Sequence, residues 1–426
     1  VLRLAVPRDF LGDIMRAQLM ELEDPLDHTM SKVCFVHGML REALERSARE
    51  RDVRPHLHGA VADVLRPKLT DGEVDVAERL AMHLRAANRL REAVAPLRIA
   101  ADVRRKRGEI DRSLQLLELH SRTLIDIEAE PEHVEWVDNL LMRTEVAWKQ
   151  GALARASRLA DESLELAERA AQTFQLAHAR YLRGYLDVHL GKLDSAEPLL
   201  FASAQDFDLL GKRVESARAM RGLGFSAISR GHHALAFGAY LTALETCRAY
   251  DDLHGAAASL AGMGFSNPDD PQGSAGHLEE ALALFERVGD LFGVASTLNN
   301  LADMHRRAGH PMEAEAHYRR ALGISQNQGA AQLEATIVAG LCLVLIAEFR
   351  YDEALRELEV AWRMADVLGQ VGALAALHAL SLPCAVVQKD RAGWAEHEAR
   401  LFARVNDEAV LDRAVSDRPV LVYDSS

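Results

Sequence analysis

Histidine pairs and adjacent carboxylates are the residues whose spacing in this sequence could support metal binding or acid–base catalysis. Two of the histidine pairs lie close together, His56 with His58 and His232 with His233. Residues two apart on a helix point to different faces, which is a poor geometry for sharing a metal ion. We expect the first pair to flank a packed helix and the second pair to lie in the turn after Gly231. The sequence therefore predicts no metal site.

The adjacent carboxylates have a structural interpretation as well. They are Asp251/Asp252, Asp269/Asp270 and Glu279/Glu280. All three pairs fall in turns between predicted helices or at helix starts, where acidic residues favour the helix dipole. We predict capping and solubility roles for these residues.

The motifs of the common catalytic classes are missing from the sequence. A phosphate-binding loop needs Gly-x-x-x-x-Gly-Lys-Ser/Thr, so that backbone N–H groups and the lysine meet the phosphates. Gly191 and Gly211 are each followed by a lysine, but both places lack the earlier glycine and the hydroxyl residue. No kinase catalytic loop, His-Glu-x-x-His motif or Gly-x-Ser-x-Gly motif occurs. We therefore predict that the protein is not an enzyme and holds no cofactor.

Composition favours a helical, cytoplasmic protein. Apolar residues make up 49% of the chain and aromatic residues only 5%, a leucine- and alanine-rich balance that suits helices. The longest apolar run, Ile337–Ala347, is about half of what is needed to cross a bilayer, so we predict no membrane span. The cysteines lie far apart without a Cys-x-x-Cys pair, which favours a reducing compartment. The chain begins with Val1 and shows no leader, and we expect it to be a fragment of something longer.

The charge distribution disfavours nucleic acid and anionic membranes as partners. The 64 acidic and 50 basic residues give a formal net charge of -14. One stretch, from Arg85 to Arg112, is basic, with four consecutive cations at 104–107. We interpret this run as a solvated helix C-terminus, because cations favour that end of the dipole and Gly108 follows. A phosphate- or partner-binding patch is the alternative interpretation.

A repeated pattern of small residues organises most of the chain. Glycine is followed five residues later by alanine at Gly151/Ala156, Gly191/Ala196, Gly231/Ala236, Gly276/Ala281 and Gly309/Ala314. A small or modest residue recurs seven positions before the glycine, and a large apolar or aromatic residue recurs four positions after the alanine. The small positions include Thr144, Gly184, Gly224, Ala302 and Cys342, and the large ones include Leu200, Tyr240, Phe285, Tyr318 and Leu358. These offsets are helical.

Such spacing predicts a chain of antiparallel helix pairs. Small side chains let the two helices of a pair approach closely, and the large residue fills the space between their ridges. The glycine between the helices ends the first one without a Cβ penalty. Each pair leaves an apolar face that only the next pair can cover, so the pairs must stack. We predict an all-α fold, a right-handed superhelical solenoid of antiparallel helix pairs with a concave inner surface.

Residues 288–322 resemble tetratricopeptide repeats. They match that family's small, glycine, alanine, tyrosine and second alanine positions at Ala302, Gly309, Ala314, Tyr318 and Ala321. The period is about 40 residues instead of the usual ~34, and it resembles the long repeats of bacterial signalling proteins. The pattern shifts at residues 266–276. There we expect an inserted loop of about five residues, an exposed bulge and a shortened second helix after it.

Residues 34–65 and 76–118 resemble the segment that joins the ATPase and winged-helix module to the repeats in large bacterial signal-transduction ATPases. Phe35, His37 and the Leu-Arg-Glu-Ala run at 40–43 match the end of that module. The resemblance implies three regions. They are a helical remnant of the ATPase/winged-helix module at 1–70, the repeat solenoid at 71–404, and a tail or terminal cap at 405–426.

The resemblance also selects a partner-binding groove, because ligands of tetratricopeptide domains contact mainly the first helix of each pair. The selected residues are Tyr181, Tyr185, Arg221, Phe225, Asn299, Asn300, Asp303 and Arg306, with Val188, Ile228, Leu343 and Ile346 beside them. The Lys, Asn and Arg set that clamps a peptide C-terminus in chaperone-binding relatives is not reproduced. For each selected residue, packing against the neighbouring repeat is the alternative role.

These observations predict a non-catalytic protein-protein interaction scaffold or sensor region of a bacterial signalling or transcription-regulating protein, which binds a peptide or protein segment in the groove. The alternative is the regulatory half of a Ser/Thr kinase or signalling ATPase whose catalytic domain lies upstream and is itself a partner. A weaker hypothesis is a nucleic-acid-linked regulator that uses the basic stretch. An incomplete end cap would expose an apolar helix face, which favours a homodimer of an isolated fragment.

Overall fold

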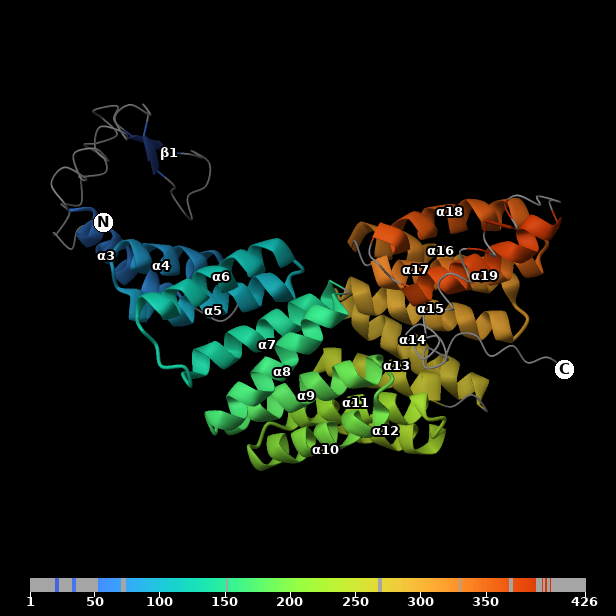
Figure 1. The fold of residues 1–426 in the computed structure, drawn as a ribbon, viewed down its shortest axis with the longest axis horizontal. Helices are drawn as coiled ribbons and strands as arrows, with labels where there is room; N and C mark the ends of the chain where they lie inside the picture. The colour runs from blue at the N-terminus through green and yellow to red at the C-terminus, as the bar shows by residue number, and fades with distance from the viewer. Residues whose placement is uncertain are drawn as a thin grey trace. The chain divides into compact units, whose positions relative to one another are not determined.

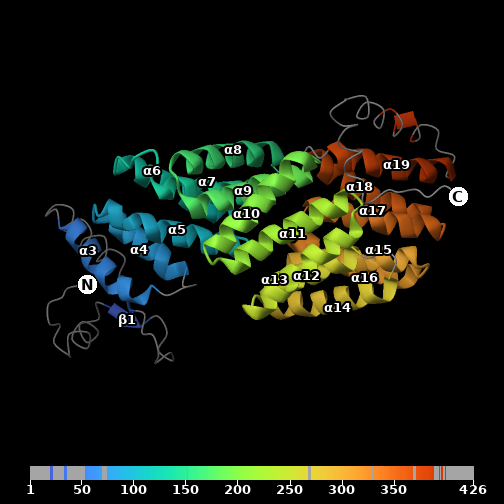
Figure 2. The same ribbon diagram turned by 90° about the horizontal axis from the view of Figure 1, so that it is seen from below.

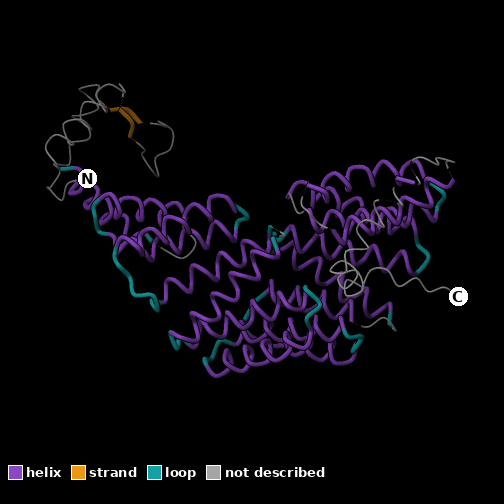
Figure 3. Tube along the Cα trace, in the orientation of Figure 1, coloured by secondary structure: helices purple, strands orange, loops and turns teal. Residues whose placement is uncertain are grey.

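The computed structural model describes residues 20–22, 33–35, 53–69, 74–150, 152–266, 270–328, 331–367 and 371–387, with a few single residues between 393 and 399. The chain divides into two compact units, Val1–Val146 and Ala147–Ser426. Helices joined by short turns make up nearly all of the described residues (Figure 3). None of the described helices is both long and apolar enough to span a bilayer.

The first unit holds a series of helices that pack in chain order (Figure 1). They are α3 (Arg54–Leu65), the 3₁₀ turn η1 (Arg66–Lys68), α4 (Val74–Ala86), α5 (Leu90–Lys106), α6 (Ile110–Asp126) and most of α7 (Val134–Lys149). Leu97, Leu116 and Leu117 are almost fully buried and form the centre of its core with four alanines of α4 and α5. This arrangement confirms helix pairs upstream of the clearest repeats.

Two short strands precede these helices. β1 (Met20–Leu22) and β2 (Val33–Phe35) pair antiparallel, with Met20 opposite Phe35. The predicted helical remnant at 1–70 did not include them. His37 and the run at 40–43 lie outside the described residues, as does the predicted tail at 405–426, and the three proposed region boundaries stay predictions.

The second unit is a regular stack of helices (Figure 2). They are α8 (Leu153–Arg169), α9 (Thr173–His189), α10 (Leu193–Leu209), α11 (Arg213–Ser229), α12 (His233–Ala249), α13 (Leu253–Ser266), α14 (Pro271–Val288), α15 (Leu291–Arg307), α16 (Pro311–Gln328), α17 (Ala331–Ala347), α18 (Tyr351–Val367) and α19 (Val371–Val387). From α9 to α12 each helix has 17 residues and three residues separate it from the next. Two such helices with their turns account for the predicted period.

Close packing within each pair follows the predicted small and large positions. The alanines four residues into α10, α12, α16 and α18 are fully buried. A Cβ placed on Gly184 of α9 would lie 2.8 Å from the Leu200 side chain of α10 and 3.1 Å from the carbonyl oxygen of Ala196. The small residue therefore lets α10 approach the α9 backbone. The predicted all-α solenoid of antiparallel helix pairs is confirmed.

The expected insertion near residue 270 is wrong. Gly276 was predicted to end a helix, but it lies inside α14, which begins at Pro271 and is capped by the Asp270 carboxylate accepting from the Gly273 N–H at 3.0 Å. The shortened helix is α13, the first of this pair, with 14 residues. In α14 the alanine position is taken by Ser274 and the large position by Leu278. A Cβ placed on Gly264 of α13 would meet atoms of both residues.

The cause of this error is the internal periodicity of the helix. Ala281 and Phe285 lie two turns after Ser274 and Leu278, so they continue the same buried stripe. A pattern of small and large residues at helical offsets repeats after seven residues, and the sequence alone did not separate the two registers. The following repeats resume their 20-residue helix spacing from Leu291 onward.

Left-handed backbone at the helix ends explains the recurring glycine. Gly191, Gly231 and Gly309 have φ between 72° and 78°, a region in which a Cβ is unfavourable. Phe349 occupies the same place after α17 with φ 60°, and its side chain is 79% exposed. It carries the conformational cost of a left-handed residue without the benefit of burial.

Replacing Phe349 by glycine is therefore expected to stabilise the protein by about 0.5–1 kcal/mol, because glycine adopts this φ without a steric penalty. Thermal and urea unfolding would measure the gain. Phe349→Ala is the matched control, since it removes the same ring but keeps a Cβ in the left-handed region. An equal gain in both variants would show that the exposed ring, and not the backbone, is responsible.

Candidate functional site

The first helices of the repeats form one continuous layer of the second unit. α9, α11, α13, α15, α17 and α19 each pack against the next helix in this series, whereas among the described residues the second helices make no comparable contacts with one another. Helices that approach more closely lie on the inside of a curved stack. We call these six helices the inner layer. All eight predicted groove residues lie on it, on α9, α11 and α15.

Aromatic side chains of α9 and α11 join into one cluster. The Tyr185 ring stacks on Tyr181, with centroids 5.7 Å apart, and meets the edge of His189 at 4.7 Å. His189 in turn lies 5.1 Å from Phe225 of α11. Trp148, near the end of α7 and within the second unit, closes the cluster at 5.3 Å from Tyr185. We call these five residues the aromatic cluster, and it links the inner helices of successive repeats.

His189 is neutral within this cluster. Burial lowers the pKa of His189 to about 4, and its Nε2 finds no hydrogen-bond partner among the described residues. A charged imidazolium would lose its hydration among aromatic rings, so the neutral form is strongly favoured at pH 7. The ring contributes an apolar surface and one unsatisfied nitrogen.

Two arginines of α11 lie next to the aromatic cluster. The Arg218 guanidinium sits over the Tyr181 ring, 4.5 Å from its centroid, in a cation–π contact. Arg221, one turn further along α11, donates from Nη1 to the Cys247 Sγ of α12 at 3.5 Å. Both side chains are half-buried. They place two cations beside the aromatic rings of α9 and α11.

The polar residues predicted on α15 form a separate group, because α13 lies between α11 and α15 in the inner layer. Arg306 donates to Asp303 at 2.6 Å, and Arg307 also pairs with Asp303, at 2.8 Å. The amide of Asn299 donates to Asn300 at 3.5 Å. The two arginines share one carboxylate, so the Asp303 charge is compensated within α15 and one positive charge remains.

The structure places the remaining predicted residues in two classes. Tyr181 is only 6% exposed, and Val188 and Ile228 are buried, so these three mainly pack between helices. Tyr185, Phe225, Arg221 and the four α15 residues are half-buried and keep part of their surface free, as do Leu343 and Ile346. For Tyr181 the alternative role of inter-repeat packing describes the structure better.

Sequence reasoning missed Trp148, His189 and Arg218. Each lies on a first helix four to six residues from the small position of its repeat, at Thr144, Gly184 and Gly224 respectively. The offsets used for the selection leave out His189 and Arg218. Trp148 lies at an offset that was used, four residues after Thr144, but the selection began with the repeat of Gly184. A search for aromatic and arginine residues over the whole inner face of each first helix would have found all three.

The other sequence candidates have structural roles. His58 and His83 share a hydrogen bond between their Nδ1 atoms at 2.8 Å, linking α3 to α4, and burial lowers the pKa of both. Within the described ranges, no group of three or more His, Cys, Asp or Glu side chains could hold a metal ion. The capping prediction is confirmed at Asp252 and Asp270, which accept from backbone N–H groups three residues later.

The basic stretch at 85–112 is a helix end that is only partly solvated, because Lys106 and Arg107 are exposed and the two arginines before them are not. It finishes α5, and Arg104 and Arg105 are largely buried and make ion pairs. The carboxylates around Arg104 are Asp75, Glu78 and Glu109, and those around Arg105 are Asp102 and Glu145. These pairs tie α5 to α4 and α7. The positive charge of this run is largely compensated inside the first unit.

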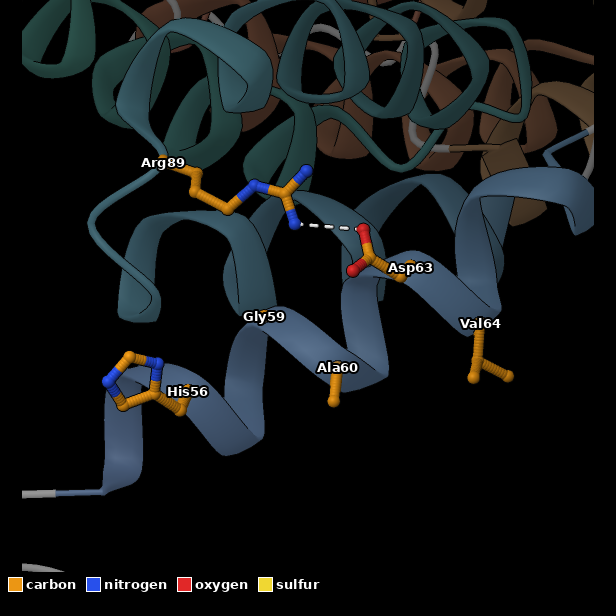
Figure 4. A pocket seen from close by; sticks show the side chains of 6 residues that line it. All are labelled: His56, Gly59, Ala60, Asp63, Val64 and Arg89. Atoms are coloured by element: carbon orange, nitrogen blue, oxygen red, sulfur yellow. Dashed lines mark hydrogen bonds and ion pairs between the residues drawn. The ribbon is translucent and has the colours of Figure 1, made fainter. Parts of the chain in front are cut away.

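A shallow hollow lies beside α3 in the first unit (Figure 4). It is lined by His56, Gly59, Ala60, Asp63, Val64 and Arg89. Its one internal polar contact is the ion pair between Arg89 and Asp63, at 2.9 Å. The mixture of small, apolar and already paired side chains does not define a catalytic constellation.

The fold is that of a tetratricopeptide-like solenoid. Residues 270–327 match the sequence profile of the tetratricopeptide repeat, and they comprise α14, α15 and nearly all of α16. This segment is a tetratricopeptide repeat, which confirms the resemblance predicted from residues 288–322 within it. No curated protein matches the sequence.

Two solved structures share the fold. A Rap protein complexed with Competence and Sporulation Factor is 16% identical, with a TM-score of 0.56, and the alignment covers 77% of this chain and 96% of that one. A signal transduction ATPase with numerous domains from Pyrococcus horikoshii, which has a tetratricopeptide repeat sensor, is 15% identical with a TM-score of 0.61. Here 96% of this chain aligns with 61% of the ATPase chain.

Proposed function

We propose that the inner layer of the second unit binds a peptide or protein segment, and that the chain is the non-catalytic interaction and sensor region of a bacterial signalling protein. The observation that carries this proposal is the aromatic cluster of α7, α9 and α11 with the two adjacent arginines of α11. Tryptophan, tyrosine and arginine are the residue types that dominate the binding energy of protein interfaces. A stacked-repeat fold presents them on an extended surface suited to a chain segment.

Composition along the inner layer supports a segment instead of a small metabolite. The surface changes from aromatic and basic on α9 and α11, through mostly apolar α13, to the amide and ion-paired group on α15. A bound chain several residues long could use all three zones, whereas a small ligand would use one. The Rap protein crystallised with Competence and Sporulation Factor has a similar fold, which is compatible with this use of the solenoid.

A second candidate is that the bound segment belongs to the same protein. The alignment of 96% of this chain with 61% of the Pyrococcus horikoshii ATPase chain favours it, because the rest of that chain has no counterpart here. The chain would then be the regulatory half of an ATPase or Ser/Thr kinase. A reading frame that continues upstream of Val1 with a phosphate-binding loop or kinase motifs would support this candidate, and a start codon immediately before Val1 would contradict it.

The proposed function is tested with a triple variant of the inner layer, Arg221→Gln, Asn300→Ala and Asp303→Asn. We expect this variant to lose a near-stoichiometric partner that the unmodified chain retains from lysate of the source organism. Mass spectrometry would identify the retained protein, and circular dichroism would show that the variant keeps its helices.

The matched control carries three substitutions on second helices, Arg320→Gln, Thr242→Ala and Asp194→Asn. All three residues are exposed, and they lie on α16, α12 and α10. This control should retain the partner. Equal retention by the inner-layer variant would contradict the proposal, and equal loss by both variants would show that general surface charge, and not the inner layer, holds the partner.

A further inference from the structure

Arg221 is a half-buried cation of the inner layer that lacks an acidic partner. Its Nη1 donates to the Cys247 Sγ at 3.5 Å, which is a weak acceptor. In the part of the chain that the structure describes, no carboxylate forms an ion pair with it. Burial raises the pKa of Cys247 to about 11, so the thiol is uncharged near neutral pH and does not balance the guanidinium.

Three other arginines of α9 and α11 are paired with acids. Arg180 on α9 meets Asp206 at 2.6 Å, and Arg183 meets Asp187 at 2.6 Å. Arg213, at the start of α11, meets Asp208 at 2.9 Å. The chain has 64 acidic residues, so carboxylates are abundant. A cation kept partly out of water without one has an unfavourable free energy that an incoming anion would relieve.

The surroundings of Arg221 are mostly apolar and aromatic, and one acid, Asp252, contacts the Cys247 thiol while it accepts from the Gly255 N–H. Phe225 follows it by one turn on α11, and its charge also acts on the phenols of Tyr185 and Tyr240. α13, which packs beside α11, contributes no Asp, Glu, Lys or Arg. Its Phe265 is 37% exposed and holds the same repeat position as Phe225, one residue after the small glycine. An anion here would be flanked by apolar surface on both sides.

We propose that Arg221 binds the side-chain carboxylate of an aspartate or glutamate in the bound segment, with a neighbouring apolar or aromatic residue of that segment packed against Phe225 and Phe265. This inference rests on the proposed function and names the chemistry of its ligand. A guanidinium presents parallel N–H donors that match a carboxylate in a bidentate pair.

The ligand group is a side chain and not a chain terminus. Terminal carboxylates are captured by several convergent donors, often backbone N–H groups. The backbone N–H groups in the middle of α11 are engaged within the helix, and Arg221 is one side chain. A single fork of donors therefore suits a single side-chain carboxylate.

The test uses the full chain and a random library of hexapeptides that are acetylated at the N-terminus and amidated at the C-terminus. The unmodified chain should select peptides with an acidic residue next to an aromatic or large apolar one. Changing that acidic residue to its amide should weaken binding by about tenfold or more. Arg221→Gln should abolish the difference between the acid and amide peptides, and Arg221→Lys should restore part of it.

Arg213→Gln is the matched control, because it removes the same charge from α11 at a position already paired with Asp208, and it should keep the acid preference. Selected peptides without an acidic residue, or an acid preference that survives Arg221→Gln in a folded protein, would overturn the role of Arg221 and leave the proposed function standing. If the unmodified chain selects no peptide at all, the inner layer does not bind such segments and both proposals fail.

Discussion

Replacing Gly262 by leucine is expected to destabilise the protein by about 3 kcal/mol, although the residue lies in a helix where leucine has the higher propensity. A Cβ placed on Gly262 would overlap the Tyr240 ring, which α12 inserts between α11 and α13. On the other side of the ring, a Cβ on Gly224 would lie 2.9 Å from it. Tyr240 is thus held between two glycines of successive inner helices.

Urea unfolding of a matched set of variants would measure this effect. Gly238 lies on α12 itself, where an added Cβ meets no atom within 4 Å, so Gly238→Ala should stabilise by about 0.5–1 kcal/mol. Removing the ring in Tyr240→Ala should make the further change Gly262→Leu cost about 2 kcal/mol less than it does alone. Independent, additive effects would show that the two residues do not compete for the same space.

Acidification is expected to weaken the second unit through His189. Its pKa is about 4 in the folded protein and about 6.5 in an unfolded chain, so the unfolded state binds the proton first. The contribution of the neutral ring is fully present above pH 6.5 and is lost as the pH falls towards 4. Between pH 7 and pH 4.5 the expected loss from this residue is up to about 2.5 kcal/mol.

The difference between the unmodified chain and His189→Phe isolates this contribution. Other histidines with lowered pKa, such as His58, His83 and His317, are present in both proteins, so their contributions cancel in the difference. Denaturant unfolding at a series of pH values should therefore show a shallower loss of stability in the variant. Parallel curves would mean that His189 is hydrated in the folded protein and does not have the pKa that its burial implies.

Much of the fold could be predicted from the sequence because the repeat uses residue size at fixed helical offsets. The small residues at Gly184, Gly224, Ala196 and Ala236 each mark a close contact within a helix pair. The period follows from the length of one such pair with its turns. The prediction failed near Gly276, where two registers of the same stripe satisfy the pattern and only the start of α14 at Pro271 decides between them.

Contacts between successive pairs were harder to predict. Gly222, Gly262 and Gly340 stand two residues before a small position, and each faces a large residue of the preceding second helix: Leu200, Tyr240 and Tyr318. They were not recognised because the pattern was sought within one pair at a time. The sequence does carry this signal, as a glycine that recurs in the first helix at three of the repeats.

The sequence predicted which helices carry the candidate site, but it did not predict which side chains contact one another there. Choosing the first helix of each pair placed the eight residues on the inner layer, because the stacking of the repeats fixes which helices lie there. Which of them would pack together depended on residues from other helices, such as Trp148 beside Tyr185 and Cys247 beside Arg221. Offsets within one repeat do not contain that information.

Photocrosslinking tests most directly whether the inner layer holds the partner. A benzophenone amino acid would replace Phe265 on α13 of the inner layer or, in a second protein, Phe201 on α10, whose side chain is 55% exposed. Each protein would be irradiated with the partner retained in the affinity experiment. We expect a crosslink from position 265 and none from position 201. A crosslink from position 201 alone would place the partner on the second helices and contradict binding at the inner layer.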